Sequence, residues 1–136
     1  MPTALEITNT MMANDFFSQW LGIEVLEIKE GYCKLKLSVR KDMLNGFGIA
    51  HGGITYCLSD SALAFASNSY GDQCVSIETS ISHTSKVKEG DVLIAEAKEL
   101  NRGHKIAIYE VAILNQENKN VSLFKGTVFR TDKKWL

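Results

Sequence analysis

One carboxylate, that of Asp60, lies in the most apolar stretch of the chain. No other residue between Ile54 and Tyr70 carries a charge, and alanine and other small residues are common there. Burial in such surroundings disfavours an ionised carboxylate unless it is paired or hydrogen-bonded. Two interpretations remain open. Asp60 bonds to a turn, to the neighbouring Ser59 or Ser61 or to a partner subunit, or it is a general base or nucleophile whose ionisation is tuned by burial.

The loop before this stretch, residues 40–53, is rich in glycine and ends in His51-Gly52-Gly53. A loop that leads directly into a helix places free backbone N–H groups and the positive end of the helix dipole where an anion or a developing oxyanion can bind. Glycine also lets a substrate approach closely. A flexible loop that simply ends at a helix start explains the same spacing. The glycines match neither a dinucleotide-binding nor a Walker pattern, so no phosphate loop is predicted.

Metal and thiol chemistry have little support in the sequence. The histidines are too far apart for a local metal motif, and no two cysteines share the C-x-x-C spacing. These residues are His51, His83, His104, Cys33, Cys57 and Cys74. No serine lies in a G-x-S-x-G motif. We therefore predict no metal site, no serine nucleophile, and reduced thiols in a cytoplasmic protein.

A basic cluster, Arg102, His104 and Lys105, falls at a predicted turn and could receive phosphate groups. A solvated charged turn is the commoner explanation for such a cluster. The chain has 15 Lys and Arg against 16 Asp and Glu, a net charge of −1, so it has no overall basic field. Nucleic acid is therefore not an expected partner, and any phosphate must be held by local groups.

The elements that must position these residues follow in a simple order. Apolar residues at helical spacing predict an amphipathic helix over residues 3–21, ended by Gly22. Residues 23–39 alternate with a period of two around Glu30-Gly31, which predicts a hairpin. Apolar side chains on every side of the segment 54–69 predict a helix that is buried all round.

Four further strands are predicted because turn residues recur at hairpin spacing. They lie near residues 74–84, 91–101, 104–115 and 120–131. In the third of them, apolar residues occupy both faces, with Ile106 and Ile108 on one and Tyr109, Val111 and Ile113 on the other. We expect the second group to be buried only where a partner covers it. The order predicts an α+β domain that buries one sheet face in an oligomer.

The length and composition set the remaining limits. A chain of 136 residues with 45% hydrophobic residues predicts a single domain over residues 1–136. No apolar stretch reaches the roughly 18 residues that cross a bilayer. The first residues lack the pattern of a secretory signal. We therefore expect a cytoplasmic protein that does not bind membranes.

Short motifs stand in a fixed order over nearly the whole chain. They are Asn14-Asp15-Phe16-Phe17, Leu44-Asn45-Gly46, His51-Gly52-Gly53, Leu58-Ser59-Asp60-Ser61-Ala62, Ala66-Ser67-Asn68-Ser69 and Leu123-Phe124-Lys125-Gly126. Together they resemble the hotdog-fold acyl-CoA thioesterases of the phenylacetate-degradation type. The resemblance implies an antiparallel sheet wrapped around a long central helix, with a short N-terminal helix. It also implies homodimers with a continuous sheet and shared active sites, usually paired into homotetramers.

The resemblance also implies roles for individual residues. Asp60 would be the general base or nucleophile in thioester hydrolysis, and the Gly52 N–H would polarise the thioester carbonyl. His51 and Asn14 would position substrate or water. The candidate substrate-binding residues are Asn45, Gly53, Arg102, His104 and Lys105. Two departures from the family pattern, Ser59 and His83-Thr84-Ser85-Lys86, concern the contacts with CoA more than the chemistry.

The sequence thus predicts hydrolysis of a small or aryl acyl-CoA, such as phenylacetyl-CoA, to the free acid and CoA. No cofactor is expected beyond the CoA of the substrate. Two alternatives remain: a non-catalytic acyl-CoA binding protein, and a hotdog enoyl-CoA hydratase or dehydratase. The second would use a histidine together with a carboxylate, which His51 and Asp60 could supply.

Overall fold

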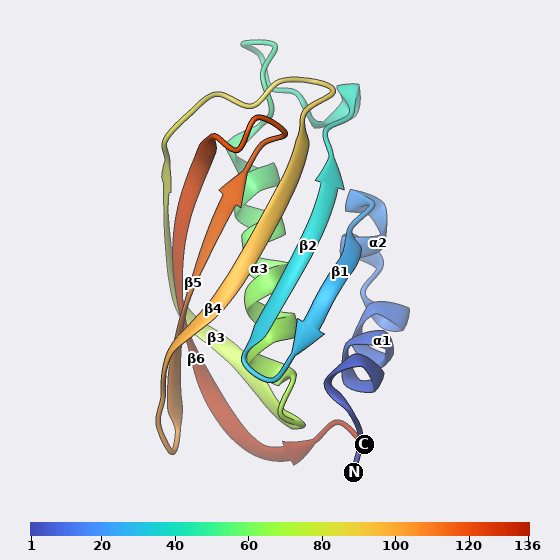
Figure 1. The fold of residues 1–136 in the computed structure, drawn as a ribbon, viewed down its shortest axis with the longest axis vertical. Coiled ribbons are helices and arrows are strands. Elements are labelled where there is room, and N and C mark those ends of the chain that lie inside the picture. Colours follow the sequence, from blue (N-terminus) through green and yellow to red (C-terminus); the bar gives the residue numbers. More distant parts are fainter.

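A six-stranded antiparallel sheet curves around one long helix in the computed structural model, which describes residues 1–136 (Figure 1). The strands lie in the order β1-β2-β4-β5-β6-β3. Their bounds are β1 Glu24–Lys29, β2 Tyr32–Ser38, β3 Asp72–His83, β4 Val92–Arg102, β5 Ile106–Leu114 and β6 Asn120–Lys134. The helices are α1 Ala4–Asn14, α2 Phe16–Leu21 and α3 Gly52–Asn68, with a short 3₁₀ helix η1 at Lys41–Met43. This is the predicted sheet around a central helix, with strand ends shifted by a few residues.

The helix α3 is buried over most of its surface, as its apolar composition predicts. Leu58, Phe65 and Ala66 are fully buried. Burying a leucine or phenylalanine completely contributes roughly 1.5–3 kcal/mol. A glycine on β6 sets the close approach of helix and sheet, because a Cβ atom at Gly126 would lie 2.5 Å from Cδ2 of Leu63.

The helix predicted over residues 3–21 is two helices, because Asp15 interrupts it. The Asp15 backbone has φ −94° and ψ 79°, and its side chain caps α2 by accepting the Ser18 N–H at 2.9 Å. Gly22 ends α2 in the left-handed conformation, with φ 75°, as predicted. Among the apolar residues of α2, Leu21 is fully buried, whereas three aromatic side chains are about half exposed or more: Phe16, Phe17 and Trp20.

The apolar residues on β5 correct a second expectation. Tyr109, Val111 and Ile113 are at most 1% exposed within a single chain. They lie on the concave face of the sheet, where α3 of the same chain covers them. The prediction that a partner is needed to bury them is therefore wrong. Ile106, on the opposite face, is 38% exposed.

Strand β3 forms one edge of the sheet, since it pairs only with β6. Val75 and Ile77 on this strand are more than half exposed. An edge strand presents a row of unpaired N–H and C=O groups to which another strand can add. The molecule therefore offers one long free edge beside α3.

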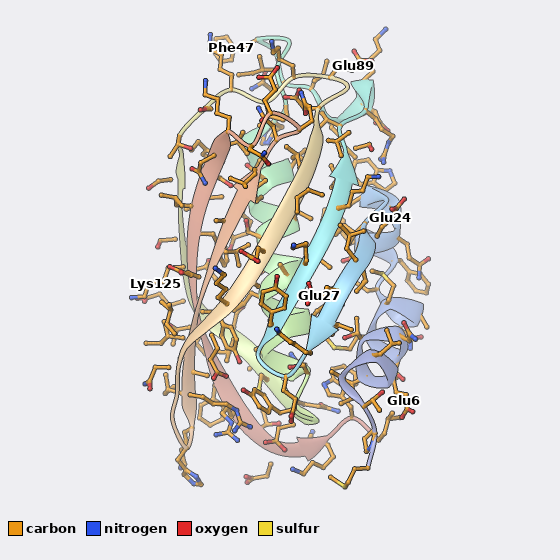
Figure 2. All side chains as sticks on the ribbon, in the orientation of Figure 1. Glu6, Glu24, Glu27, Phe47, Glu89 and Lys125 are labelled. Atoms are coloured by element: carbon orange, nitrogen blue, oxygen red, sulfur yellow. The ribbon has the colours of Figure 1, made fainter.

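The loop that precedes α3 and the β3–β4 connection lie together at one end of the molecule (Figure 1). Figure 2 shows Phe47 and Glu89 at this end, and Lys125 pointing outward from the sheet. Within the loop, Leu44 and Ala50 form an isolated antiparallel bridge. No helix of the chain is long and apolar enough to cross a membrane.

Candidate active site

The N-terminus of α3 presents one free backbone N–H group. His51 is the N-cap, and its Nδ1 accepts the Gly53 N–H at 2.8 Å. The Ile54 N–H donates to the His51 carbonyl at 2.9 Å. The Gly52 N–H donates to no protein atom, so it is the amide that can bind a ligand oxygen. Because His51 Nδ1 is an acceptor here, the other ring nitrogen, Nε2, carries the proton in the neutral ring.

A cavity of about 410 Å³ opens at this end of α3. Asn45, Gly52, Thr55 and His83 are among its lining residues. The Asn45 side chain shapes the loop itself, since its Oδ1 accepts the Phe47 N–H at 2.9 Å. Asn45 and Gly52 thus line the same cavity, and the role of Asn45 in substrate binding stays a prediction.

His83, at the end of β3, lines this cavity but was not among the predicted site residues; the sequence marked it only as part of a departure from the family pattern. Its Nδ1 lies 3.2 Å from the Thr55 hydroxyl, and its Nε2 would lie 3.2 Å from a Cβ atom at Gly52. The helix α3 has 17 residues and rises 1.5 Å per residue, whereas a strand rises about 3.3 Å per residue. A strand that runs back along α3 therefore reaches the N-terminus of the helix after roughly eight residues. That comparison of lengths, together with a predicted hairpin return, could have placed His83 near Gly52.

The Asp60 carboxylate lies half-buried beside β3. It lines a small cavity of about 70 Å³ together with Cys74, Ser76 and Val128. Burial raises the pKa of Asp60, and the negative charge of Asp15 raises it further. A raised pKa brings a carboxylate closer to the range in which it works as a general base near neutral pH.

Asp60 has no hydrogen-bond donor or cation within its own chain, although both of its serine neighbours are buried. The Ser61 hydroxyl lies 2.8 Å from the Ser18 hydroxyl instead, and the Ser59 hydroxyl has no partner. The interpretation in which Asp60 bonds to Ser59 or Ser61 therefore does not hold in the single chain. A partner subunit or a substrate remains as its counterpart.

Asp15 is a second carboxylate near this position, and the sequence did not single it out as a site residue. Its Oδ2 accepts a hydrogen bond of 2.6 Å from the Ser18 hydroxyl, which contacts Ser61. The predicted residue Asn14 is its neighbour in sequence, and the Asn14 amide donates only to the Thr10 carbonyl, at 3.4 Å. Within one chain, Asp15 is thus the member of this pair that connects to α3.

The two residues predicted to carry out the reaction, Gly52 and Asp60, lie far apart within one chain. Gly52 and Asp60 are eight residues apart on α3, so the helix rise separates them by about 12 Å along the axis. One thioester group cannot contact both. If these residues act on one substrate, they must come from two chains.

The predicted phosphate-binding residues lie at the other end of the sheet, in the β4–β5 connection (Figure 1). The guanidinium carbon of Arg102 lies 3.7 Å from the centroid of the Tyr70 ring, and Arg102 is 3.9 Å from Asp72. His104 and Lys105 line a separate cavity there. The predicted substrate-binding set is therefore divided between the two ends of the chain. Nowhere do three or more histidine, cysteine, aspartate or glutamate side chains gather as metal ligands would.

Known proteins share both the sequence and this architecture. Residues 47–122 match the family model described as the thioesterase superfamily. A putative esterase of Archaeoglobus fulgidus is 42% identical over 127 residues, which cover 93% of this chain and 82% of that protein. The acyl-coenzyme A thioesterase PaaI of Escherichia coli is 34% identical, over 93% of this chain and 91% of that protein.

Solved structures give the same picture. The structure of the E. coli PaaI protein, from the phenylacetic acid degradation operon, superposes with a TM-score of 0.94 over 96% of this chain and 95% of that one, at 33% identity. A Streptococcus mutans protein solved with bound acetyl-CoA superposes with a TM-score of 0.80 at 27% identity, over 82% of this chain and 90% of that one.

The sheet wrapped around α3 and its likeness to these structures define a hotdog fold, as predicted. The chain belongs to the thioesterase superfamily. The prediction that it is a thioester hydrolase is confirmed by this membership.

Proposed function

We propose that this protein hydrolyses acyl-CoA thioesters, with Asp60 as general base or nucleophile and the Gly52 N–H as the group that polarises the carbonyl. The observation that carries the proposal is that Asp60 is half-buried without any partner in its own chain. A structural carboxylate in such a position would be paired. The similarity to an acyl-CoA thioesterase, and to a protein that binds acetyl-CoA, supports the choice of substrate class.

The reaction can follow two routes from this geometry. As a general base, Asp60 takes a proton from water while the water oxygen bonds to the thioester carbonyl carbon. As a nucleophile, an oxygen of Asp60 itself bonds to that carbon, and water then hydrolyses the resulting anhydride. In both routes the carbonyl oxygen gains negative charge and accepts a hydrogen bond from the Gly52 N–H. The C–S bond breaks, the sulfur leaves with the electron pair and is protonated, and the products are the acid and CoA.

We further propose a homodimer in which each active site uses both chains. Along β3, Asp60 lies beside Cys74 and Ser76, and Gly52 lies beside His83. Between these levels, the Tyr56 hydroxyl contacts the Thr79 hydroxyl at 2.6 Å. If two β3 edges pair antiparallel about a two-fold axis near Thr79, Asp60 of one chain comes level with Gly52 of the other. The free edge of β3 and the 12 Å separation within one chain both support this arrangement.

The roles of the remaining residues stay predictions. His51 caps the helix that carries Gly52 and, with Asn14, would position substrate or water. Gly53 and Asn45 would hold the acyl end of the substrate at the same loop. We retain a small or aryl acyl group, such as phenylacetyl, and a cytoplasmic homotetramer built from two dimers, as parts of the proposal.

The release of free CoA thiol from a panel of acyl-CoA esters tests the proposal. We expect turnover with small and aryl esters, and its absence from every ester would overturn the assignment. Saturable ester binding without thiol release would favour the non-catalytic binding protein. Hydration of an enoyl-CoA without thiol release would favour the hydratase. Single-turnover reactions in H₂¹⁸O test the nucleophilic route, because water that attacks the Asp60 carbonyl carbon of the anhydride puts the label into Asp60, whereas the general-base route puts it only into the free acid.

A further inference from the structure

The ring of His83 lies at the start of α3, beside the amide that we propose polarises the carbonyl. Its Nε2 would lie 3.2 Å from a Cβ atom at Gly52. The nitrogen and the Cβ atom of one residue are about 2.5 Å apart, so Nε2 lies within roughly 6 Å of the Gly52 nitrogen. His83 also lines the cavity of about 410 Å³ that opens at this point. The ring is therefore a neighbour of any group that binds to the Gly52 N–H.

The buried side chain of Thr55 fixes the orientation of this ring. The Thr55 hydroxyl donates to the Gly52 carbonyl at 3.1 Å, and Thr55 is 3% exposed. Because its single proton is used in that bond, its oxygen accepts the Nδ1–H of His83 at 3.2 Å. Nδ1 thus keeps its proton in both the neutral and the charged ring. Any proton that His83 exchanges with a ligand is carried by Nε2.

Nε2 of His83 is available for such an exchange. It makes no hydrogen bond or ion pair within the chain. No carboxylate lines the cavity, and Lys86 is its only other ionisable side chain. Of these two groups, only His83 contacts the Gly52 position. An imidazole can give up a proton and take one back near neutral pH, so His83 has the chemistry of a proton donor.

His51, the other histidine at the start of α3, is bound to a different task. Its Nδ1 accepts the Gly53 N–H at 2.8 Å and so caps the helix. Protonation of that nitrogen would break the bond and remove the cap. The ring of His83 can change its protonation state without such a loss, because its exchanging nitrogen holds no part of the helix.

The proposed hydrolysis needs a proton donor at the sulfur. When the C–S bond breaks, the sulfur leaves with the electron pair as an alkyl thiolate, which is basic. The carbonyl oxygen lies about 3 Å from the Gly52 nitrogen when it accepts that N–H. The sulfur is bonded to the same carbon as this oxygen, so it comes within reach of a ring that stands beside Gly52.

We propose that His83 is the general acid that protonates the departing sulfur. The inference rests on the proposed thioester hydrolysis and adds its proton donor. The Nε2–H bond breaks as the S–H bond forms, and the electron pair of the N–H bond stays on Nε2. The neutral ring then regains a proton from solvent, to which Asp60 releases the proton that it took from water. In the nucleophilic route the same transfer accompanies formation of the anhydride.

Two thioesters of one acid separate this role from other roles of His83. One has N-acetylcysteamine as its leaving group, an alkyl thiol like the end of CoA. The other has 4-nitrothiophenol, a far more acidic thiol whose thiolate leaves without a proton. The variant His83→Gln keeps a hydrogen-bond donor but cannot transfer a proton. The control Ser82→Gln places the same side chain on the opposite face of β3.

We expect His83→Gln to lower kcat/KM for the alkyl thioester about 10²-fold, and to leave the aryl thioester close to the wild type. Ser82→Gln should change neither value. In His83→Ala, added imidazole should restore part of the activity toward the alkyl thioester only, because it supplies the missing acid.

Equal losses with both thioesters would mean that His83 acts on the carbonyl or on packing, and would overturn its role as general acid. Unchanged activity of His83→Gln toward both esters would overturn it as well. Either result leaves hydrolysis by the wild type intact. A wild type that releases thiol from no thioester, CoA esters included, overturns the proposed function itself.

Discussion

The Ser18 hydroxyl lies 2.8 Å from the Ser61 hydroxyl, and this contact joins α2 to α3 one residue from Asp60. Ser18 also donates to Asp15, so a carboxylate at the break between α1 and α2 is linked to the turn of α3 that carries Asp60. The interruption of the N-terminal helix thus places a second negative charge near the proposed base. Burial raises the pKa of Asp60 most and the Asp15 charge raises it further, while the charge of Asp60 in turn raises the pKa of the neighbouring Cys57 thiol.

The variant Asp15→Asn should shift the acid limb of the kcat/KM profile to lower pH. Asp15 raises the pKa of Asp60, so removal of its charge lowers that pKa and makes the base available at lower pH. Asparagine still caps α2, and the stability cost should stay within about 1 kcal/mol. The exposed Asp42→Asn serves as the control and should leave the profile in place. An unchanged profile in Asp15→Asn would show that Asp15 has only a structural role.

The variant Asp60→Asn should lose about 10²- to 10⁴-fold in kcat, the usual contribution of a general base. It should also be more stable than the wild type at neutral pH, because burial disfavours the charged form of Asp60. Since the folded pKa lies above the unfolded value, the wild type should lose stability as pH rises through the interval between them. Denaturant unfolding at several pH values measures this, and Asp60→Asn should lack that slope. Full activity in the variant would remove Asp60 from the mechanism.

The variant Gly52→Pro should remove the free N–H without breaking α3. Proline is accepted at the first position of a helix, and His51, with φ −59° and ψ 139°, has the extended backbone that a following proline requires. We expect kcat to fall about 10²- to 10³-fold, as for the loss of one oxyanion-hole donor. Gly52→Ala is the matched control, since it adds a Cβ near His83 but keeps the N–H. Equal losses in the two variants would point to crowding against His83 as the cause.

Mixing the two inactive variants tests whether the active site is shared. In a heterodimer of Asp60→Asn and Gly52→Pro chains, one site carries both defects and the other carries none. Random exchange of chains should therefore restore about a quarter of the wild-type activity. A site contained in one chain predicts no recovery. Native mass spectrometry of the mixture confirms that chains have exchanged, so that a negative result counts against the shared site.

The variant Gly126→Ala should destabilise the protein by about 1–3 kcal/mol through overpacking. Its Cβ would lie 2.5 Å from Leu63, whereas a Cβ at the control position Gly46 meets nothing within 4 Å. Adding Leu63→Val should recover part of the loss, and thermal unfolding of the two single variants and the double variant measures that coupling. Additive losses would show that Gly126 and Leu63 do not compete for the same space.

Several features were determined by the local sequence. The helix of residues 52–68 could be predicted because its apolar side chains point to every side, and such a helix has to be buried. The turns at Gly22 and Gly31 could be predicted because glycine is the residue that most readily adopts a positive φ. The structure shows a positive φ at both positions. Asp60 could be singled out because a lone charge in an apolar segment is an unusual pattern, whereas Gly52 was singled out by the resemblance of the ordered motifs to a known family. None of these features depends on which segments meet in space.

Other features were decided only by the tertiary structure. The sequence could not show which face of β5 meets α3, because both faces carry apolar residues and only the packing of the helix selects the one with Tyr109. It could not place Asp15 beside α3, because the Ser18–Ser61 contact that joins them links segments that are distant along the chain. It could not show that Asp72 faces Arg102 while Lys105 stays free. Residue types and short spacings specify which groups could react. Only the folded chain determines which of them meet, because long-range contacts depend on how sheet and helix pack together.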